Sequence, residues 1–389
     1  MTILQYLKQS LKNGVRTMTS RRIYMVSMIV LPLFMCVFLV TLLQSGLPVQ
    51  VPTAVVDLDR SQLSREVTRS LKAQQLAHVT AEYDSYEDAL DAVRGGKAYG
   101  FFVIPRNFQR DAVAGNTPTI EYYSNMVYFV AGTFSIKGYK SVAVSSAAGM
   151  LGGEAQSAGL TPAQVTALIQ PVNINVNAIH NPWPNYSVYL TPSFMAAALA
   201  LMIMVVTVFS ITSEIKNGTS RRWLSDAGNS IIVAVTGKLL PQSVVFSIVA
   251  LCMQGVIYGF CHFPMYGSVT ALIFVTILFV VANQSMGLFL ASAIPNMRLG
   301  LSSAALLSIL AFSFCGFSFP VEHMYGALGV FSYIMPVRYY FLYYISNILN
   351  GFPIYYCRWD IAALILFVIG GGALLWRLKR AMLRPVYIP

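Results

Sequence analysis

Six long apolar runs dominate the hydrophobic pattern along this chain. A helix needs roughly 20 apolar residues to cross the hydrocarbon core of a bilayer, so each run predicts a membrane-spanning helix. The runs cover residues 23–43, 193–212, 241–260, 269–293, 300–319 and 359–378. The first run is too long for a signal-peptide core and lacks an A-x-A cleavage site, so we expect a retained membrane anchor.

A segment of mixed polarity separates the first two runs and has the size of one ordinary domain. Short apolar runs predict strands there, whereas apolar positions at helical spacing predict helices. We expect strands at residues 51–59, 99–105 and 119–124, and helices at residues 62–75, 86–94, 127–150 and 161–169. Alternating strands and helices are typical of a compact α/β domain. The predicted fold class is therefore an α-helical multi-pass membrane protein of six spans with an inserted α/β domain.

The expected organisation has three parts. Residues 1–45 hold the N-terminus and the first span, residues 46–188 form the inserted domain, and residues 189–389 form a five-span transmembrane domain. We expect the inserted domain outside the cytoplasm. It carries no pattern of catalytic or metal-binding residues: its two histidines are far apart, and its acidic residues do not match a calcium loop.

Composition agrees with lipid as the solvent for much of the chain. Hydrophobic residues make up 56% of it and charged residues only 11%, against about 25% charged residues in soluble domains. The five cysteines form no C-x-x-C pair, so neither a disulfide framework nor a zinc site is expected.

The net charge of +11 is compatible with a nucleic-acid partner, but its distribution indicates membrane topology instead. With the N-terminus in the cytoplasm, 14 basic residues and two acidic residues lie on the cytoplasmic side, as the positive-inside rule requires. Residues 46–186 are nearly neutral, with 10 basic and 11 acidic residues. We therefore expect both termini in the cytoplasm and no nucleic-acid partner.

Residues 326–349 are apolar but carry Pro336 and Arg338 in their middle. Counting this segment as a seventh span would place the basic C-terminal tail outside and break the charge rule. We expect a re-entrant or interfacial hairpin at residues 320–350 on the outer side. Irregular backbone at that depth needs protein or water around it. Arg338 is then the outer charge at membrane depth, with Glu322 or a lipid head group as its candidate partner.

The loop after the second span, residues 213–230, combines acidic, basic and aromatic residues. Glu214 precedes a bend at Gly218, and Arg221, Arg222 and Trp223 follow directly. Arginine and tryptophan are common anchors of protein interfaces, so this loop is a candidate docking site for a soluble partner. Charge alone favours the simpler interpretation, a basic loop that only sets topology.

A family resemblance changes that balance. The loop is similar to the E-x-x-x-G-T-x-x-x-x-L pattern of type-2 ABC exporter permeases, with matches at Glu214, Gly218, Thr219 and Leu224. Lys238 resembles the lysine commonly found before the third span of these proteins. A later G-x-x-x-P-x-x-x-M stretch with a following proline is matched by Gly316, Pro320, Met324 and Pro336. The motifs follow the family order along essentially the whole chain. Residues 55–64, 104–108 and 181–182 resemble the subgroup with a large extracytoplasmic domain.

The resemblance implies a six-span subunit that pairs with a second permease subunit, as a homodimer or a heterodimer. It also implies cytoplasmic ABC ATPase subunits that dock on residues 214–226 and carry ATP and Mg. The chain has no G-x-x-x-x-G-K-[ST] phosphate loop of its own, so no cofactor or catalytic residue is expected on it. A periplasmic membrane-fusion adaptor is a further candidate partner. The expected function is export of an amphipathic or hydrophobic substrate.

Some positions depart from the family pattern. Ala227 and Tyr325 stand where the family usually has proline, and Ile215 with Lys216 replaces a commoner charged pair. If Pro241 opens the third span, Lys238 lies at the membrane interface, where its ammonium group can snorkel to water. A gating role for Lys238 is the alternative that the resemblance suggests.

Two other classes of protein compete with the exporter. A membrane-anchored sensor or assembly scaffold would bind a ligand with its outer domain without transport, but the chain has only short cytoplasmic loops for output. A membrane-embedded enzyme would need an acid pair, a histidine cluster or a nucleophile at the end of a span, and the sequence shows none.

Overall fold

A computed structural model describes residues 2–44, 46, 50–73, 77–114, 116, 119–125, 185–317, 319 and 321–384. The chain divides into two compact units, one of Met1–Gln44 with Ala178–Pro389 and the other of Ser45–Asn177. The helices expected at residues 127–150 and 161–169, and the family match at residues 181–182, lie outside the described residues.

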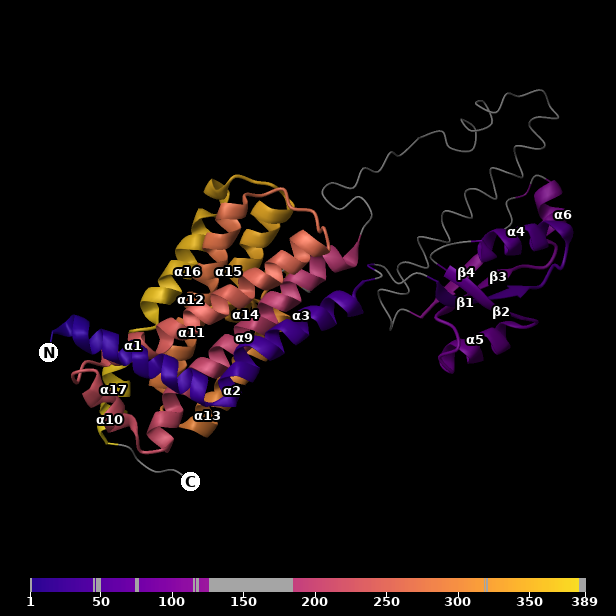
Figure 1. Ribbon diagram of the computed structural model, residues 1–389. Helices are drawn as coiled ribbons and strands as arrows, with labels where there is room; N and C mark the ends of the chain where they lie inside the picture. The colour runs from indigo at the N-terminus through magenta and orange to yellow at the C-terminus, as the bar shows by residue number, and fades with distance from the viewer. Residues whose placement is uncertain are drawn as a thin grey trace. The chain divides into compact units, whose positions relative to one another are not determined.

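The larger unit is a helical bundle (Figure 1). Within the described residues, six helices are long and apolar enough to cross a membrane, and each overlaps one predicted run, so the six-span prediction is confirmed. In chain order they comprise α2 (Arg22–Met25), η1 (Val26–Val30) and α3 (Leu31–Leu42); α9 (Tyr186–Lys216); α11 (Ile231–Gln254) and η2 (Gly255–Phe260); α12 (Val269–Ala293); α13 (Met297–Phe314); and η5 (Ile354–Cys357), α16 (Arg358–Gly370) and α17 (Leu375–Leu383).

Helix α9 is the centre of this bundle. It packs against α3, α12 and α13, and most of its side chains are buried. Small residues allow its neighbours to approach closely. A Cβ atom added to Gly287 of α12 would lie only 2.9 Å from the Cβ of Thr207, so glycine is required where α12 crosses α9. Close backbone packing of this kind supplies van der Waals contact where lipid removes the hydrophobic driving force.

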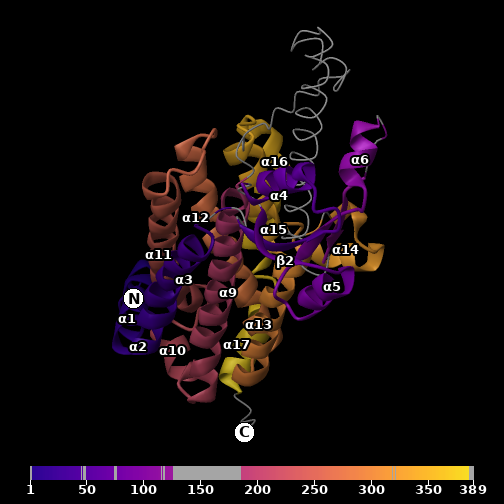
Figure 2. The ribbon, with the colours of Figure 1, turned by 90° about the vertical axis from the view of Figure 1, so that its right-hand side faces the viewer.

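The first helix of the chain, α1 (Ile3–Ser20), was not predicted from the sequence. It precedes the first span and runs along α11, as the two views in Figures 1 and 2 show. Its contact with α11 is made by small residues. A Cβ atom on Gly14 would lie 2.3 Å from the carbonyl oxygen of Gly237, and Ser10 donates a hydrogen bond of 3.2 Å to the carbonyl of Val233. The basic N-terminal segment is therefore part of the packed bundle.

The apolar segment between α13 and α16 forms short helices in place of a seventh span. They are η3 (Val321–His323), α14 (Gly326–Ser332), α15 (Pro336–Tyr343) and η4 (Tyr344–Leu349). Neither α14 nor α15 is long enough to cross a bilayer. Helix α15 packs against α9, α12 and α16, whereas Tyr333 and Ile334 in the turn between α14 and α15 are exposed. Pro336 opens α15 at the position where a missing N–H costs nothing.

The smaller unit contains a four-stranded sheet in the order β2-β1-β3-β4. Its strands are β1 (Val51–Asp57), β2 (Ala77–Tyr83), β3 (Gly100–Ile104) and β4 (Glu121–Ser124). Strand β1 runs parallel to both β2 and β3, and β4 is antiparallel to β3. Strand β2 was not predicted; the other three match predicted strands. The strands and helices alternate along the chain, as expected for an α/β arrangement.

Helices cover both faces of this sheet. The helices are α4 (Gln62–Lys72), α5 (Tyr86–Arg94) and α6 (Phe108–Val113). On one face Val55 and Phe102 pack with α4 and α6, and on the other Val56 and Phe101 pack with α5. Successive residues of β1 and β3 thus point to opposite faces, as the two-residue period of a strand requires. This explains why both strands are apolar throughout: each contributes to two cores.

An aspartate joins β1 to α6 in this unit. The carboxylate of Asp59 accepts a hydrogen bond of 3.0 Å from the backbone N–H of Gln109, at the start of α6. Partial burial raises the pKa of Asp59, but hydrogen bonds from Ser61 and from the backbone of α6 outweigh it and hold that pKa below its usual value of 3.8. The carboxylate is therefore ionised at neutral pH and holds the start of α6 beside β1.

Candidate functional site

A buried ion pair lies where α9, α10 (Ser220–Asp226) and α11 meet. The ammonium nitrogen of Lys238 is 2.5 Å from Oε1 of Glu214, and the two side chains are only 4% and 14% exposed. The hydroxyl of Thr219 donates a hydrogen bond to the other carboxylate oxygen of Glu214. The ring of Trp223 covers the ammonium group at 4.3 Å from the ring centroid. These contacts bring together four residues that the sequence analysis singled out.

The position of Lys238 corrects one expectation. Helix α11 begins at Ile231, so Pro241 lies inside the helix instead of opening it. Lys238 is consequently buried among helices and does not snorkel to water. The expectation was wrong because it assumed that proline marks the start of the span, whereas neighbouring helices tolerate a proline inside a membrane helix.

The turn before α10 depends on a left-handed residue. Gly218 has φ +70° and no atom near the position of a Cβ, so glycine is needed there for backbone conformation and not for space. The N–H of Thr219 then bonds the carbonyl of Glu214 at 3.0 Å and reverses the chain. The E-x-x-x-G-T pattern is thus the sequence of a tight turn that brings α10 back to the end of α9.

Helix α10 also holds the C-terminal end of α17. The buried hydroxyl of Ser220 donates to the carbonyl of Met382 at 2.9 Å, and Nε of Arg221 donates to the carbonyl of Leu383 at 3.0 Å. The last carbonyls of a helix have no partner within the helix, so these bonds cap α17. Leu224 packs with Met382 in the same apolar cluster. The segment after the second span is therefore attached to the last span.

The exposed face of α10 is basic. Arg221 and Arg222 are both exposed, whereas Leu224 is buried and Trp223 is half-buried over Lys238. Trp223 therefore contributes to packing within the chain, whereas both arginines of α10 are exposed. Figures 1 and 2 show α10, α17 and α1 gathered at one end of the bundle.

Helix α1 contributes to this end of the bundle. Nδ2 of Asn13 donates a hydrogen bond of 3.3 Å to Asp226 at the end of α10. The ring of Tyr6 lies against Gly228, whose φ of +66° and close contact both require glycine. The sequence analysis did not identify Asn13, Ser220 or the end of α17 as parts of the site. No local pattern could have shown them, because Ser220 and Met382 are 162 residues apart.

The remaining residues with family matches lie around α15. Arg338 is buried, and its Nη1 lies near Gly316, which has φ +97° after the end of α13. Pro336 is buried at the first position of α15, and Met324 is half-buried in the loop before α14. Pro320 lies outside the described residues, as does the side chain of Glu322. The structure therefore brings Gly316 and Arg338 together.

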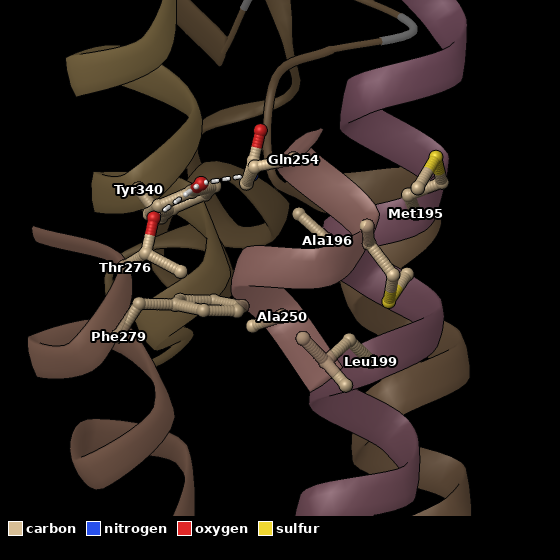
Figure 3. Close-up of a pocket in the computed structure, with 9 residues that line it drawn as sticks. Met195, Ala196, Leu199, Ala250, Gln254, Thr276, Phe279 and Tyr340 are labelled. Carbon is tan, nitrogen blue, oxygen red and sulfur yellow. Dashed lines mark hydrogen bonds between the residues drawn. The ribbon is translucent and has the colours of Figure 1, made fainter. Parts of the chain in front are cut away.

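A small polar network lies between α9, α11, α12 and α15 (Figure 3). The hydroxyl of Tyr340 accepts a hydrogen bond of 2.7 Å from Gln254 and lies 3.2 Å from the hydroxyl of Thr276. Met195, Leu199 and other apolar residues surround a cavity of about 10 Å³ beside it, roughly the space for one water molecule. This cavity is too small for an organic substrate, so the described conformation holds no substrate chamber here.

Metal chemistry has no candidate centre in the part of the chain that the structure describes. No group of three or more histidine, cysteine, aspartate or glutamate residues is arranged there to hold a metal ion. The geometry at α10 supports a mechanical role instead: a short exposed helix whose contacts reach α1, α9, α11 and α17.

Comparison with known proteins decides the family. Residues 22–377 match the model of the ABC-2 family transporter proteins. The chain belongs to this family. This ABC-2 permease is also 22% identical over 161 residues to the probable multidrug ABC transporter permease YbhR of Escherichia coli strain K12, and equally to its counterpart in strain O157:H7. The alignment covers 41% of this chain and 44% of each relative, so the chain matches less than half the length of these curated proteins.

Membership has direct structural consequences. ABC-2 family transporter proteins are membrane proteins, in agreement with the six candidate spans of the described residues. The resemblance identified from the motifs is therefore confirmed for the family. The family match runs through the segment that includes Glu214 and Lys238.

Proposed function

We propose that this permease exports an amphipathic or hydrophobic substrate, driven by a separate cytoplasmic ABC ATPase that docks on α10. The ATPase would carry ATP and Mg, and a second permease subunit, identical or related, would complete the transport unit. On this proposal both termini and α10 face the cytoplasm, the unit of residues 45–177 lies outside it, and the membrane is the bacterial inner membrane. The multidrug description of the E. coli relatives favours an amphipathic cargo.

The observation that carries the proposal is the attachment of α10 to several spans at once. An isolated basic loop would set topology and nothing more. Here the exposed Arg221 and Arg222 belong to a helix joined to α9 by the Gly218 turn, to α11 through Lys238, and to α17 through its end cap. A force applied to the exposed face of α10 would reach all three helices.

The mechanism follows from these connections. Packed elements shift as rigid bodies between discrete arrangements because close packing resists continuous deformation. Closure of the ATPase around ATP would displace α10, and the buried Glu214–Lys238 pair would pass this displacement to the inner ends of α9 and α11. The cap on α17 would pass it to the last span. The permease itself contributes no chemistry in this cycle; it supplies the lever and the pathway.

Basic residues on α10 suggest an acidic docking surface on the ATPase. Arg222 is the most direct probe, because it is exposed and its side chain is not part of the cap on α17. We expect Arg222→Glu to weaken ATPase binding about tenfold, which corresponds to about 1.4 kcal/mol. Arg298→Glu is the matched control: Arg298 is also exposed, in the first turn of α13 on the same predicted side.

The experiment measures ATPase binding and turnover with the full-length permease in liposomes. Stimulated ATP hydrolysis that falls with Arg222→Glu and persists with Arg298→Glu would support the proposal. Equal stimulation by both variants would remove α10 as the docking site. A permease that neither binds nor stimulates an ABC ATPase would instead favour the sensor or scaffold, whose ligand binding would not depend on ATP.

A further inference from the structure

Arg338 is a buried cation with no ion-pair partner among the described residues. Only 7% of this residue is exposed, and none of its nitrogens makes a hydrogen bond or ion pair with the described part of the chain. Its Nε is shielded from solvent and has no hydrogen-bond partner in the part of the chain that the structure describes. A guanidinium group carries five N–H donors, so a buried arginine normally pairs with a carboxylate or a phosphate. The N–H donors of Arg338 therefore require a hydrogen-bond acceptor.

The contacts of Arg338 hold the group in place without neutralising it. The ring of Tyr333 lies over the guanidinium, with the ring centroid 4.9 Å from Cζ. Nη1 lies beside Gly316, where a Cβ atom would be in contact at 3.4 Å. Asp360, in the first turn of α16, is close enough to interact electrostatically with Arg338 but forms no ion pair with it among the described residues. The ring of Tyr333 therefore packs on the guanidinium, and no described residue accepts a hydrogen bond from it.

The surroundings make a free cation at this point unfavourable. The neighbouring side chains of α15 contact membrane spans: Tyr339 packs on Phe367 of α16, and Tyr340 packs on Phe279 of α12. Arg338 also lies in the first turn of α15, where the helix dipole is positive. Charged residues at membrane depth are costly and usually mark a functional site. An anion would be favoured here by both the side chain and the helix end.

An apolar groove begins at the same tyrosine. The groove has a volume of about 330 Å³ and opens between α12, α16 and the α14–α15 turn. Its apolar lining includes Phe289, Leu366 and Phe367, and Gly370 leaves its floor open. Tyr333 lines the groove, and its ring also lies over the guanidinium of Arg338. A cation and an apolar groove in this arrangement match a ligand with an anionic head and an apolar tail.

We propose that Arg338 binds the phosphate head group of an amphiphile whose tail lies in this groove, which we name the α12–α16 groove. Guanidinium matches phosphate in planar, two-point hydrogen bonding, so phosphate is the head group that the site fits best. The site does not depend on ATPase docking at α10 and concerns a different part of the bundle. A membrane phospholipid and a phosphorylated cargo share this chemistry, and a free phosphate ion is the simplest competitor.

Native mass spectrometry of the full-length permease in detergent tests the proposal. Three probes are compared: didecanoyl phosphatidic acid, didecanoyl phosphatidylcholine and inorganic phosphate. We expect phosphatidic acid to bind at least tenfold more tightly than phosphatidylcholine. Arg338→Gln should reduce the affinity for phosphatidic acid about tenfold, equivalent to about 1.4 kcal/mol. It should reduce the affinity for phosphatidylcholine less, because the choline ammonium offsets the charge of that lipid's phosphate. Arg338→Lys keeps the charge and should retain part of the preference.

Arg358→Gln is the matched control. Arg358 also stacks on a tyrosine, with Cζ 4.0 Å from the ring centroid of Tyr355, but it is exposed. If Arg358→Gln loses as much affinity for phosphatidic acid as Arg338→Gln, the binding depends on general surface charge. This result would overturn the proposal. Gly370→Leu fills the groove, since nothing lies near a Cβ at Gly370. Gly370→Leu should lower the affinity for phosphatidic acid and leave the affinity for inorganic phosphate unchanged.

Two further outcomes would overturn the proposal. Inorganic phosphate that binds as tightly as phosphatidic acid would assign the site to a free anion and exclude the tail. Glu322→Gln tests the sequence-based alternative that Glu322 neutralises Arg338. If Glu322→Gln destabilises the protein and the added change Arg338→Gln restores its unfolding midpoint, Glu322 is the counter-ion. We expect instead that Arg338→Gln alone, in lipid-free detergent, leaves the unfolding midpoint unchanged or raises it.

Discussion

The Glu214–Lys238 pair offers the sharpest quantitative test of the structure. Replacing Lys238 by methionine keeps most of the side-chain volume and removes the ammonium group, which leaves Glu214 without its cation. Removing one partner of a fully buried pair typically costs 3–5 kcal/mol. Here Glu214 is 14% exposed and keeps the hydrogen bond from Thr219. We therefore expect a coupling energy nearer to about 2–3 kcal/mol.

A double-mutant cycle isolates this energy. The four proteins are the natural chain, Lys238→Met, Glu214→Gln and the double variant, and their unfolding free energies are measured by titration with a denaturing detergent. We expect each single change to be strongly destabilising and the double variant to be much less destabilised than the sum of the two. The reason is that the double variant buries neither charge alone.

A second lysine–glutamate pair in the same chain is the matched control. Lys72 and Glu82 are also 2.5 Å apart, but their side chains are 49% and 53% exposed. Exposed pairs contribute about 0.2–1 kcal/mol because water solvates both partners. The same cycle with Lys72→Met and Glu82→Gln should therefore give a small coupling energy. If the coupling at Lys238 is no larger than this, burial does not strengthen the pair and its role in transmitting motion from α10 must be abandoned.

Three other predictions test the packing, the polar network and the pH response. Gly14→Val should separate α1 from α11 and cost about 1–3 kcal/mol of unfolding free energy, whereas Gly255→Val meets nothing within 4 Å and should lower the thermal midpoint much less. Tyr340→Phe removes the partner of Gln254 and should cost about 1–2 kcal/mol in the same assay; an unchanged midpoint would show that water replaces the hydroxyl. Because the folded-state pKa of Asp59 lies below 3.8, its ionised form stabilises the smaller unit above that pH, and this stability is lost as the pH falls through the folded pKa. The protease resistance of the smaller unit should therefore decrease in acid. In Asp59→Asn, which lacks the charge at every pH, the protease resistance should decrease less.

Much of the architecture could be read from the chain because it depends on local composition. The six spans are confirmed because lipid selects for unbroken apolar runs, and such a run is visible without knowing its neighbours. Strand β1 and helix α5 were predicted for a similar reason: a short apolar run and apolar positions at helical spacing are local signals. Helix α1 escaped prediction because its packing stripe consists of Ser10 and Gly14, which carry no hydrophobic signal.

The candidate sites depend on contacts between distant segments. The turn at Gly218 is encoded in a few adjacent residues, which are those of the E-x-x-x-G-T family pattern. Three features arise only when helices far apart in the chain come together: the burial of Lys238, the cap that Ser220 places on α17, and the burial of Arg338. Hydrophobicity along a chain records which solvent each residue prefers, whereas pairing depends on how closely two backbones can approach. In this permease, that approach is governed by small residues such as Gly237 and Gly287, whose effect appears only in three dimensions.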